Sequence, residues 1–451
     1  MTKSDLIVIG AGPGGYETAL RAAARGMKTV LINGGQVGGT CLNEGCIPTK
    51  CMVKDAAVVN TCRHADEFGV QEVAYNIDFN KVITRREAVV SQLREGVAGM
   101  LVKAGVQVVN AKASFKDAFT VVADGEEYNA EHIVIATGSQ SKALPIPNAE
   151  AEWVLDSSKI LKLEYIPAQL VIVGGGVIGL EFASVFNAFG SEVTVIEFMK
   201  NILPPFDSDI SKRMKQALTK RGIKILTGAA VKKVEQTSDY KIQTTYELKG
   251  KEETVVSTDL LMAVGRKPNL EGLNLEAAGV IYSPKGIPVD DNMRTNVDHI
   301  YAIGDVNARM MLAHVATFQG IRALNAIEGK SDSIDFSVVP SAVFTDPECA
   351  MAGMTEEQAK AAGINVKIGK GFFRANGKAL AMGESDGIVK LVFNADTEEL
   401  IGAHIMGPEA ALLGQQCADF ITAHRTAGDI RQTIFGHPTL SEVILAAAES
   451  I

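Results

Sequence analysis

Two cysteines set five residues apart are the part of this sequence best suited to redox chemistry. Cys41 and Cys46 lie in the stretch GGTCLNEGCIPTK, residues 38–50. In an unbroken helix they would be about 7.5 Å apart along the axis, whereas a disulfide requires Cα atoms within roughly 7 Å. A bond between them therefore requires a local distortion of the backbone, and Gly45 and Pro48 are residues that permit one.

Metal binding is the alternative use of these thiols. Cys51 and Cys62 could supply two more sulfur ligands, but the region has no C-x-x-C or C-x-x-H pair of the kind that holds zinc, and no metal site is predicted. Six cysteines in 451 residues are too few for a secreted disulfide scaffold, so a cytoplasmic protein is expected. There, a close cysteine pair beside a nucleotide site favours thiol–disulfide exchange.

Length and charge narrow the class of protein. A chain of 451 residues has room for about three domains, and 47% hydrophobic with 22% charged residues is ordinary globular composition. Lys plus Arg number 44 and Asp plus Glu 53, so the net charge is −9 and no general attraction to nucleic acid or anionic membrane is expected. The longest apolar stretch, residues 170–180, falls short of the roughly 20 residues that span a bilayer.

A glycine turn of one kind occurs twice, and the cysteine stretch follows directly on the first nucleotide unit that it forms. The spacing is G-x-G-x-x-G: Gly10, Gly12 and Gly15, then Gly174, Gly176 and Gly179. The first glycine allows a tight bend, the second lets the backbone approach a pyrophosphate, and the third lets helix pack on strand. Helix N-terminal amides then receive the phosphate charge. We therefore predict two dinucleotide-binding units, with strands at 6–9, 28–32, 170–173 and 192–196 and helices at 16–25 and 180–189.

The residue at the end of the second strand of each unit is expected to contact the adenosine ribose. In the second unit this is Glu197, whose carboxylate suits the hydroxyls of an unphosphorylated ribose and favours NAD over NADP. Lys200, three residues on, leaves some room for a 2′-phosphate. In the first unit the position is Asn33, which can bond a hydroxyl without the strength of a charged acceptor.

The cysteine segment resembles the active-site stretch of the FAD-dependent pyridine nucleotide–disulfide oxidoreductases. The resemblance extends over essentially the whole chain, through further stretches that look like family motifs: 136–138 (ATG), 263–269 (AVGRKPN), 295–305 (ending YAIGD), 311–314 (MLAH), 344–348 (FTDPE) and 437–442 (HPTLSE). It implies an α/β fold with two Rossmann-like domains, for FAD and NAD, and a C-terminal α+β dimerisation domain. From these motifs we expect an FAD domain at 1–144, an NAD domain at 145–264, a return segment at 265–335 completing the FAD site, and the dimerisation domain at 336–451.

The resemblance implies a role for each candidate catalytic residue. Cys41 would be the thiol that exchanges with the substrate, and Cys46 would lie against the flavin as the charge-transfer thiolate. Lys50 would lie beside the flavin and pair with Glu181 of the NAD domain. His437, oriented by Glu442, would accept the substrate thiol proton and would come from the other subunit of a homodimer. A histidine suits that task because it titrates near neutral pH.

The resemblance also implies which residues bind the cofactors. Asp305 would bond the FAD ribitol, and the backbone at Ala313 would face the flavin pyrimidine edge. The full predicted set comprises Gly10, Gly12, Gly15, Asn33, Thr40, Lys50, Ala113, Thr137, Gly138, Gly174, Gly176, Gly179, Glu197, Gly265, Asp305 and Ala313.

Four features depart from the family pattern. Asn33 replaces the expected acid, and residues 110–115 (NAKASF) have alanines where the family usually has glycines near the FAD adenine. Both bear on FAD affinity. Phe435 stands where a second histidine is common, and the chain ends nine residues after Glu442 (451 − 442). These two bear on substrate access and dimer stability.

The resulting prediction is an enzyme that oxidises protein-bound dihydrolipoamide with NAD+ through the cysteine pair and FAD. Its partners would be a second copy of the chain and a lipoyl-bearing protein, such as a 2-oxoacid dehydrogenase acyltransferase or a glycine cleavage carrier protein. A glutathione-reductase-like activity is the alternative within the family, although Leu440 and Glu197 argue against it. A mainly structural flavoprotein subunit of a multienzyme complex is the alternative outside catalysis.

Overall fold

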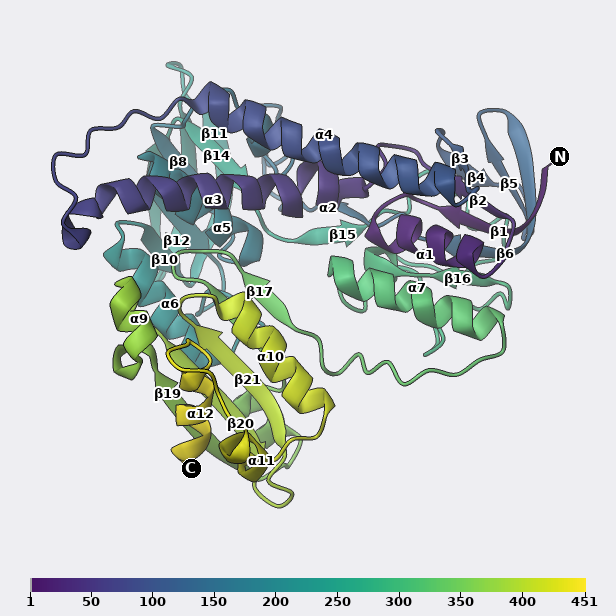
Figure 1. The fold of residues 1–451 in the computed structure, drawn as a ribbon. Helices are drawn as coiled ribbons and strands as arrows, with labels where there is room; N and C mark the ends of the chain where they lie inside the picture. The colour runs from purple at the N-terminus through teal and green to yellow at the C-terminus, as the bar shows by residue number, and fades with distance from the viewer. Residues whose placement is uncertain (1) are drawn as a thin grey trace.

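The computed structural model describes residues 2–451, which form three sheet-based units with helices packed around them (Figure 1). The N-terminal unit lies at the right of the view, and the C-terminal unit lies at the bottom. Two long helices, α3 (Cys46–Arg63) and α4 (Phe79–Lys103), run side by side along the top from the first unit to the second. The cysteine segment stands at the start of α3.

The first unit is built on a seven-stranded sheet. Its parallel part has the order β3-β2-β1-β6, β16 pairs in parallel with the end of β6, and β5 and β4 continue from β6 in antiparallel. The bounds are β1 (Thr2–Ile9), β2 (Thr29–Ile32), β3 (Gln107–Val109), β4 (Ala113–Phe115), β5 (Thr120–Ala123), β6 (Glu126–Ile135) and β16 (Ile300–Ala302). Leu6 and Val8 pack in one core and Ile7 and Ile9 in another, which is why β1 is apolar at successive positions.

Helices α1 (Pro13–Ala24) and α7 (Ala313–Ile327) pack against each other beside this sheet. The two helices approach so closely at Gly320 that a Cβ atom there would lie 2.0 Å from Thr18 Oγ1. The N-terminal ends of both helices point toward the cysteine segment, where α2 (Gly39–Glu44) precedes α3.

The second unit has a four-stranded parallel sheet in the order β10-β9-β8-β14, with a three-stranded antiparallel sheet, β11-β12-β13, beside it. The bounds are β8 (Gln169–Val173), β9 (Glu192–Glu197), β10 (Lys224–Thr227), β11 (Ala229–Gln236), β12 (Ile242–Leu248), β13 (Lys251–Ser257) and β14 (Asp259–Met262), with helices α5 (Val177–Phe189) and α6 (Ser208–Lys220). Phe182 and Phe186 of α5 are fully buried in its core.

Both predicted strand–turn–helix units are present, and each helix begins three residues earlier than predicted. Gly12 and Gly176 are the residues that cap α1 and α5. The third glycine of each motif, Gly15 or Gly179, therefore lies within the first turn of the helix. Glycine disfavours helix in isolation, but its close packing against the strand outweighs that propensity here.

The second unit is inserted into the first. The chain leaves through β7 (Ser139–Ser141) and returns through β15 (Arg266–Pro268), and these two strands pair in antiparallel. After the return, β16 joins the first sheet beside β6. The domain limits at residues 144, 264 and 335 stay predictions.

The third unit is a five-stranded antiparallel sheet in the order β17-β18-β21-β20-β19. The strands are β17 (Ser341–Val343), β18 (Cys349–Gly353), β19 (Val366–Phe372), β20 (Ile388–Asn394) and β21 (Leu400–Met406). The helices are α8 (Glu356–Ala361), α9 (Gly377–Met382), α10 (Ala410–Thr422), α11 (Ala427–Gln432) and α12 (Glu442–Glu449). Within residues 2–451, none of the helices is both long and apolar enough to cross a membrane.

Candidate functional site

The helix that carries the two cysteines is broken between them. α2 ends at Glu44, Gly45 adopts φ −145° and ψ −109°, and α3 starts at Cys46. A Cβ atom on Gly45 would lie 2.8 Å from the carbonyl oxygen of Thr40, so a larger residue would force this junction apart. The predicted distortion is confirmed, and it brings the thiols of Cys41 and Cys46 into contact.

Cys46 is the member of the pair that is held as a thiolate. Contact with the Cys41 thiol, and the positive charge of Lys50, lower the pKa of Cys46 to about 7. The same contact, together with burial, raises the pKa of Cys41 far above its ordinary value. Above pH 7 the negative charge of the pair therefore lies mainly on Cys46.

Lys50 is fixed by a carboxylate from the second unit. Its Nζ lies 2.9 Å from both Oε1 and Oε2 of Glu181 on α5. The Glu181 side chain is 4% exposed and also accepts a hydrogen bond of 3.0 Å from the backbone N–H of Phe344, at the start of the third unit. The Lys50 ammonium lies 4.8 Å from the centre of the Phe344 ring. All three units therefore meet at this ion pair.

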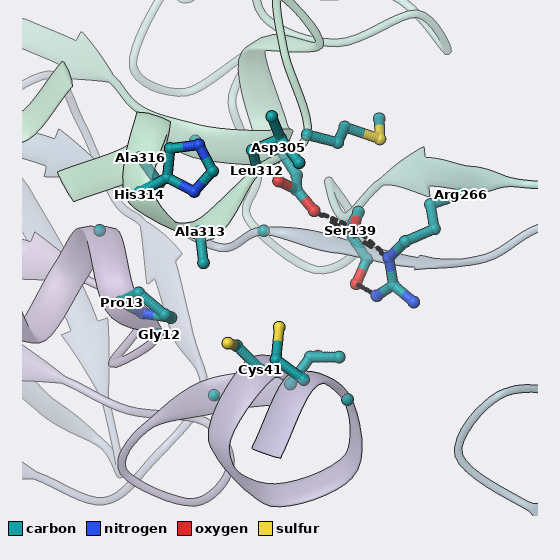
Figure 2. Close-up of a pocket in the computed structure, with 18 of the residues that line it drawn as sticks. Gly12, Pro13, Cys41, Ser139, Arg266, Asp305, Leu312, Ala313, His314 and Ala316 are labelled. Atoms are coloured by element: carbon teal, nitrogen blue, oxygen red, sulfur yellow. Dashed lines mark hydrogen bonds and ion pairs between the residues drawn. The ribbon is translucent and has the colours of Figure 1, made fainter. Parts of the chain in front are cut away.

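One large cavity, of about 2380 Å³, adjoins the cysteine pair. Thirteen of the predicted site residues line it: Gly10, Gly12, Asn33, Thr40, Cys41, Cys46, Lys50, Ala113, Thr137, Gly138, Glu181, Asp305 and Ala313. Figure 2 shows Gly12, Pro13, Cys41 and Ala313 around one space, and Asp305 lies on the side of that space opposite Cys41. Residues scattered over 300 positions of sequence thus form a single site.

The three motif glycines of the first turn differ in how closely other atoms approach them. A Cβ atom on Gly10 would lie 2.3 Å from the Ala136 carbonyl oxygen, and one on Gly15 would lie 1.8 Å from the Gly10 carbonyl oxygen. These two glycines are therefore required by the chain itself. A Cβ atom on Gly12 would meet nothing closer than 4.0 Å, so its lack of a side chain leaves space open to the cavity. A dinucleotide pyrophosphate fits this opening beside the first amides of α1.

The second turn repeats this division. Its three motif glycines do not line the large cavity, although Val177 and Ile178, which lie between them, do. Cβ atoms on Gly174 and Gly179 would lie 2.3 and 2.1 Å from backbone carbonyl oxygens, whereas one on Gly176 would meet nothing within 4 Å. Glu197 contacts the turn directly. Its Oε2 accepts a hydrogen bond from the N–H of Gly175 and its Oε1 accepts one from the N–H of Met199, both at 2.6 Å. Glu197 is thus fixed at the end of β9, and its contact with a ribose stays a prediction. Gly265, predicted to bind a cofactor, also lies outside the residues that line the cavity.

Asn33 has a structural task that the sequence did not reveal. Its Nδ2 donates to the Gly35 carbonyl at 2.9 Å, and its Oδ1 accepts from the Gly35 N–H at 3.3 Å. Asn33 is 5% exposed, so its amide shapes the loop after β2 at the cavity wall.

Ser139 and Arg266 are two site residues that the sequence reasoning missed. Ser139 Oγ donates to Asp305 Oδ2, while Arg266 donates from Nε to Ser139 Oγ and from Nη2 to the Ser139 carbonyl, both at 2.7 Å (Figure 2). Arg266 lies within a motif recognised in the sequence, but its contact with Ser139 arises from the pairing of β7 with β15. Together they orient the Asp305 carboxylate at the cavity.

His437 and Glu442 form a pair away from the cysteines of the same chain. His437 Nδ1 lies 2.9 Å from Glu442 Oε1, and Glu442 Oε2 accepts from the Thr439 N–H at 2.8 Å. The contact with His437, and the Thr439 N–H, lower the pKa of Glu442. Neither residue lines the cavity, and the His437 side chain is 79% exposed. Within residues 2–451, no group of three or more His, Cys, Asp or Glu side chains could hold a metal ion.

The two kinds of glycine in the second turn predict different mutant behaviour. We expect Gly176→Ala to retain the thermal stability of the parent but to bind NADH at least about tenfold more weakly, because the added methyl group occupies only the ligand's space. Gly179→Ala should instead lower the melting temperature, because its Cβ would lie 2.1 Å from the Gly174 carbonyl. Differential scanning calorimetry and NADH titration measure the two effects. Equal stability losses in both variants would contradict the assignment.

The charge of Lys50 predicts how the reactivity of Cys46 depends on pH. A lowered pKa means that the thiolate is present above about pH 7 and is lost as the pH falls through that value. Lys50→Met removes the positive charge beside Cys46 and leaves the negative charge of Glu181, so the Cys46 thiolate should form only at higher pH. The rate of alkylation of the reduced protein by iodoacetamide, measured against pH, reports the midpoint. Lys54→Met, an exposed position on the same helix, is the control, and an unchanged midpoint in Lys50→Met would disprove this role.

Comparison with known proteins gives the same assignment over the whole length of the chain. The pattern described as "Pyridine nucleotide-disulphide oxidoreductase" matches residues 4–320, and that of the dimerisation domain of the same family matches residues 339–448. The dimerisation domain supports a homodimer.

Individual relatives agree. A protein named dihydrolipoyl dehydrogenase from Bacillus subtilis is 42% identical over 446 residues, covering 97% of this chain and 96% of its own. One of the same name from Thermus scotoductus is 40% identical over 455 residues, covering 100% and 98%. A solved structure of the HOCl-induced flavoprotein disulfide reductase RclA from Escherichia coli, in a Cu(II) complex, superimposes with a TM-score of 0.89 at 29% identity, covering 100% and 99%. On the matched motifs, the shared architecture and these full-length similarities, the chain belongs to the pyridine nucleotide-disulphide oxidoreductase family.

Proposed function

We propose that this protein is a dihydrolipoyl dehydrogenase, which oxidises dihydrolipoamide to lipoamide with NAD+. The observation that carries the proposal is the Cys41–Cys46 pair, with a Cys46 pKa of about 7, in the wall of the cavity that the first dinucleotide turn also lines. Full-length similarity to proteins named dihydrolipoyl dehydrogenase supports the choice of substrate within the family.

FAD and NAD are the cofactors. Gly10, Gly12 and Gly15, Asp305 and the N-terminal end of α7 at Ala313 would hold FAD, which supplies the electron transfer between the Cys46 sulfur and NAD+ when it is bound. Gly174, Gly176, Gly179 and Glu197 would hold NAD. The negative charge of Glu197 favours a ribose without a 2′-phosphate, since it would repel that group.

Thiol–disulfide exchange starts from the oxidised pair. One substrate thiol gives its proton to His437 of the partner subunit, and its thiolate attacks the Cys41 sulfur, so that the Cys41–Cys46 bond breaks and Cys46 leaves as a thiolate. The second substrate thiol then attacks the first substrate sulfur, which forms the lipoamide disulfide and breaks the bond to Cys41; the proton of this second thiol passes to the released Cys41 sulfur. One disulfide has been reduced and one dithiol oxidised. Lys50 stabilises the Cys46 thiolate, and the raised pKa of Cys41 keeps that sulfur protonated.

His437 must come from a second copy in this scheme. Within one chain it lies outside the cavity that contains Cys41, and its exposed imidazole is oriented by Glu442 at 2.9 Å. A hydrogen bond to Nδ1 leaves Nε2 available to exchange the substrate proton.

We propose a lipoyl-bearing protein, such as a 2-oxoacid dehydrogenase acyltransferase or a glycine cleavage carrier protein, as the second partner, and a cytoplasmic location.

The proposed function predicts a spectroscopic change on reduction. Anaerobic titration of the FAD-containing protein with dihydrolipoamide should produce a long-wavelength absorbance band from the Cys46 thiolate beside the flavin. Cys46→Ser should lack this band, whereas Cys62→Ser, at a cysteine outside the cavity lining, should keep it. Protein that purifies without FAD and cannot bind it, or that is not reduced by the dithiol, would refute the proposal.

The proton acceptor gives a second, kinetic prediction. His437→Ala should slow oxidation of dihydrolipoamide by a factor of about 100 to 10,000, the usual effect of losing a general base. Because His437 serves only the dithiol step, oxidation of NADH by an artificial electron acceptor should stay close to the parent rate. His424→Ala, a second exposed histidine of the same unit, is the control. Undiminished dithiol oxidation in His437→Ala would remove His437 from the site.

A further inference from the structure

A lysine of the third unit is buried among carboxylates and is not among the residues that line the cavity at the cysteine pair. The Lys390 side chain, in β20, is 2% exposed. Its Nζ lies 3.0 and 2.9 Å from the two carboxylate oxygens of Asp207, 3.2 Å from Asp209 Oδ2 and 2.7 Å from Glu356 Oε2. Burying an ammonium group is unfavourable unless it is paired, so these contacts hold one another in place.

The main partner of this lysine belongs to a different unit. Asp207 is fully buried and lies immediately before α6 of the second unit, where its Oδ1 also accepts from the Asp209 N–H at 2.9 Å. The ion pair therefore ties the start of α6 to the sheet of the dimerisation domain. It also determines where the loop 198–207, which leads from Glu197 to α6, must end.

This loop contains a strained residue. Leu203 has φ +48°, a left-handed conformation that is unfavourable for a leucine, and it is followed by two prolines. Such a conformation persists only where the surroundings enforce it. Leu203 is fully buried, and its N–H donates to the carbonyl of Gly175 at 2.9 Å. The end of the same loop is held at Asp207.

Gly175 is the middle residue of the second glycine turn. Its N–H donates to Glu197 at 2.6 Å, and a Cβ atom on it would lie 3.0 Å from Ile202 Cγ2. The loop thus packs directly against the turn and bonds to its carbonyl through Leu203. A shift of the loop would change the shape of the turn.

We propose that Lys390 is a positioning residue for NAD, which acts from the dimerisation domain through Asp207 and Leu203. By fixing Asp207 it keeps the loop 198–207 in its strained form, and the loop in turn keeps the glycine turn shaped for a pyrophosphate. Without Lys390, Leu203 can relax and Gly175 moves with it, while the cysteine pair is unaffected. This inference rests on the proposed use of NAD.

The test uses the full-length, FAD-containing protein and three variants. Lys390→Met combined with Asp207→Asn removes the ion pair without leaving a buried charge on Asp207, and asparagine still caps α6. Asp207→Asn alone is the milder second variant, should the double variant not fold. Lys370→Met is the matched control, because Lys370 also pairs with Asp209, at 2.9 Å, but its side chain is 42% exposed.

Titration calorimetry with ADP-ribose, which contains the pyrophosphate and the adenosine ribose but undergoes no redox reaction, reports the site directly. We expect its dissociation constant to rise about tenfold in the double variant and by a smaller factor in Asp207→Asn. The KM for NAD+ should rise in parallel, while the rate of flavin reduction by dihydrolipoamide stays within about twofold of the parent. The control should match the parent in all three measurements.

The contrary outcomes are distinct. Folded variants that bind ADP-ribose as tightly as the parent would overturn the role of Lys390. A joint loss of ADP-ribose binding and dithiol reduction would also overturn it, because Lys390 would then support the whole fold. Failure of the parent protein itself to bind ADP-ribose would refute the proposed NAD site, and this inference with it.

Discussion

The ion pair between Lys50 and Glu181 is the contact on which the arrangement of this site depends. Lys50 belongs to the cysteine helix, Glu181 to the helix of the second dinucleotide unit, and the N–H that Glu181 also accepts comes from Phe344 of the third. Removing one partner of a fully buried pair costs about 3–5 kcal/mol. The cost here is smaller, since the Lys50 side chain is 34% exposed, but it leaves a buried carboxylate beside the cysteines. The contact that joins the units therefore also sets the charge around Cys46.

The dimerisation domain does more than join two copies. Besides Phe344, it supplies Asp346, whose oxygens accept from Asn60 of α3 at 3.0 Å and from Arg221 at the end of α6 at 2.9 Å. Lys390 holds the other end of α6. The third unit thus contacts the cysteine helix and both ends of a helix in the second unit, so the relative position of the cysteine pair and the second glycine turn depends on it.

The glycines show how one residue type serves different purposes at neighbouring positions. Gly10, Gly15, Gly174 and Gly179 face backbone carbonyls at distances that exclude any side chain, while Gly12 and Gly176 face open space. The first four are explained by the fold alone. The other two leave space that the fold does not fill, as the proposed dinucleotide binding requires, and this distinction is invisible in the G-x-G-x-x-G spacing itself.

Much of this protein could be predicted from local sequence, because the relevant interactions are local. The strand–turn–helix units follow from apolar runs and turn glycines, and the break between Cys41 and Cys46 follows from the reach of a disulfide and from Gly45. Helix starts were misplaced, since the packing of Gly15 and Gly179 against the sheet outweighs their poor helix propensity. The hydrogen bonds of Asn33 to Gly35 were missed because the same spacing also suits a ribose contact.

The sequence by itself predicted the chemistry: a pair of sulfurs suited to redox exchange, and two turns suited to dinucleotides. Only the tertiary structure decided other polar contacts that hold the units together. Ser139 meets Arg266 because β7 pairs with β15, and Lys390 meets Asp207 because the third unit packs against α6. These partners are more than a hundred residues apart, and no periodicity or spacing encodes such contacts, because they arise only when separately folded layers are brought together.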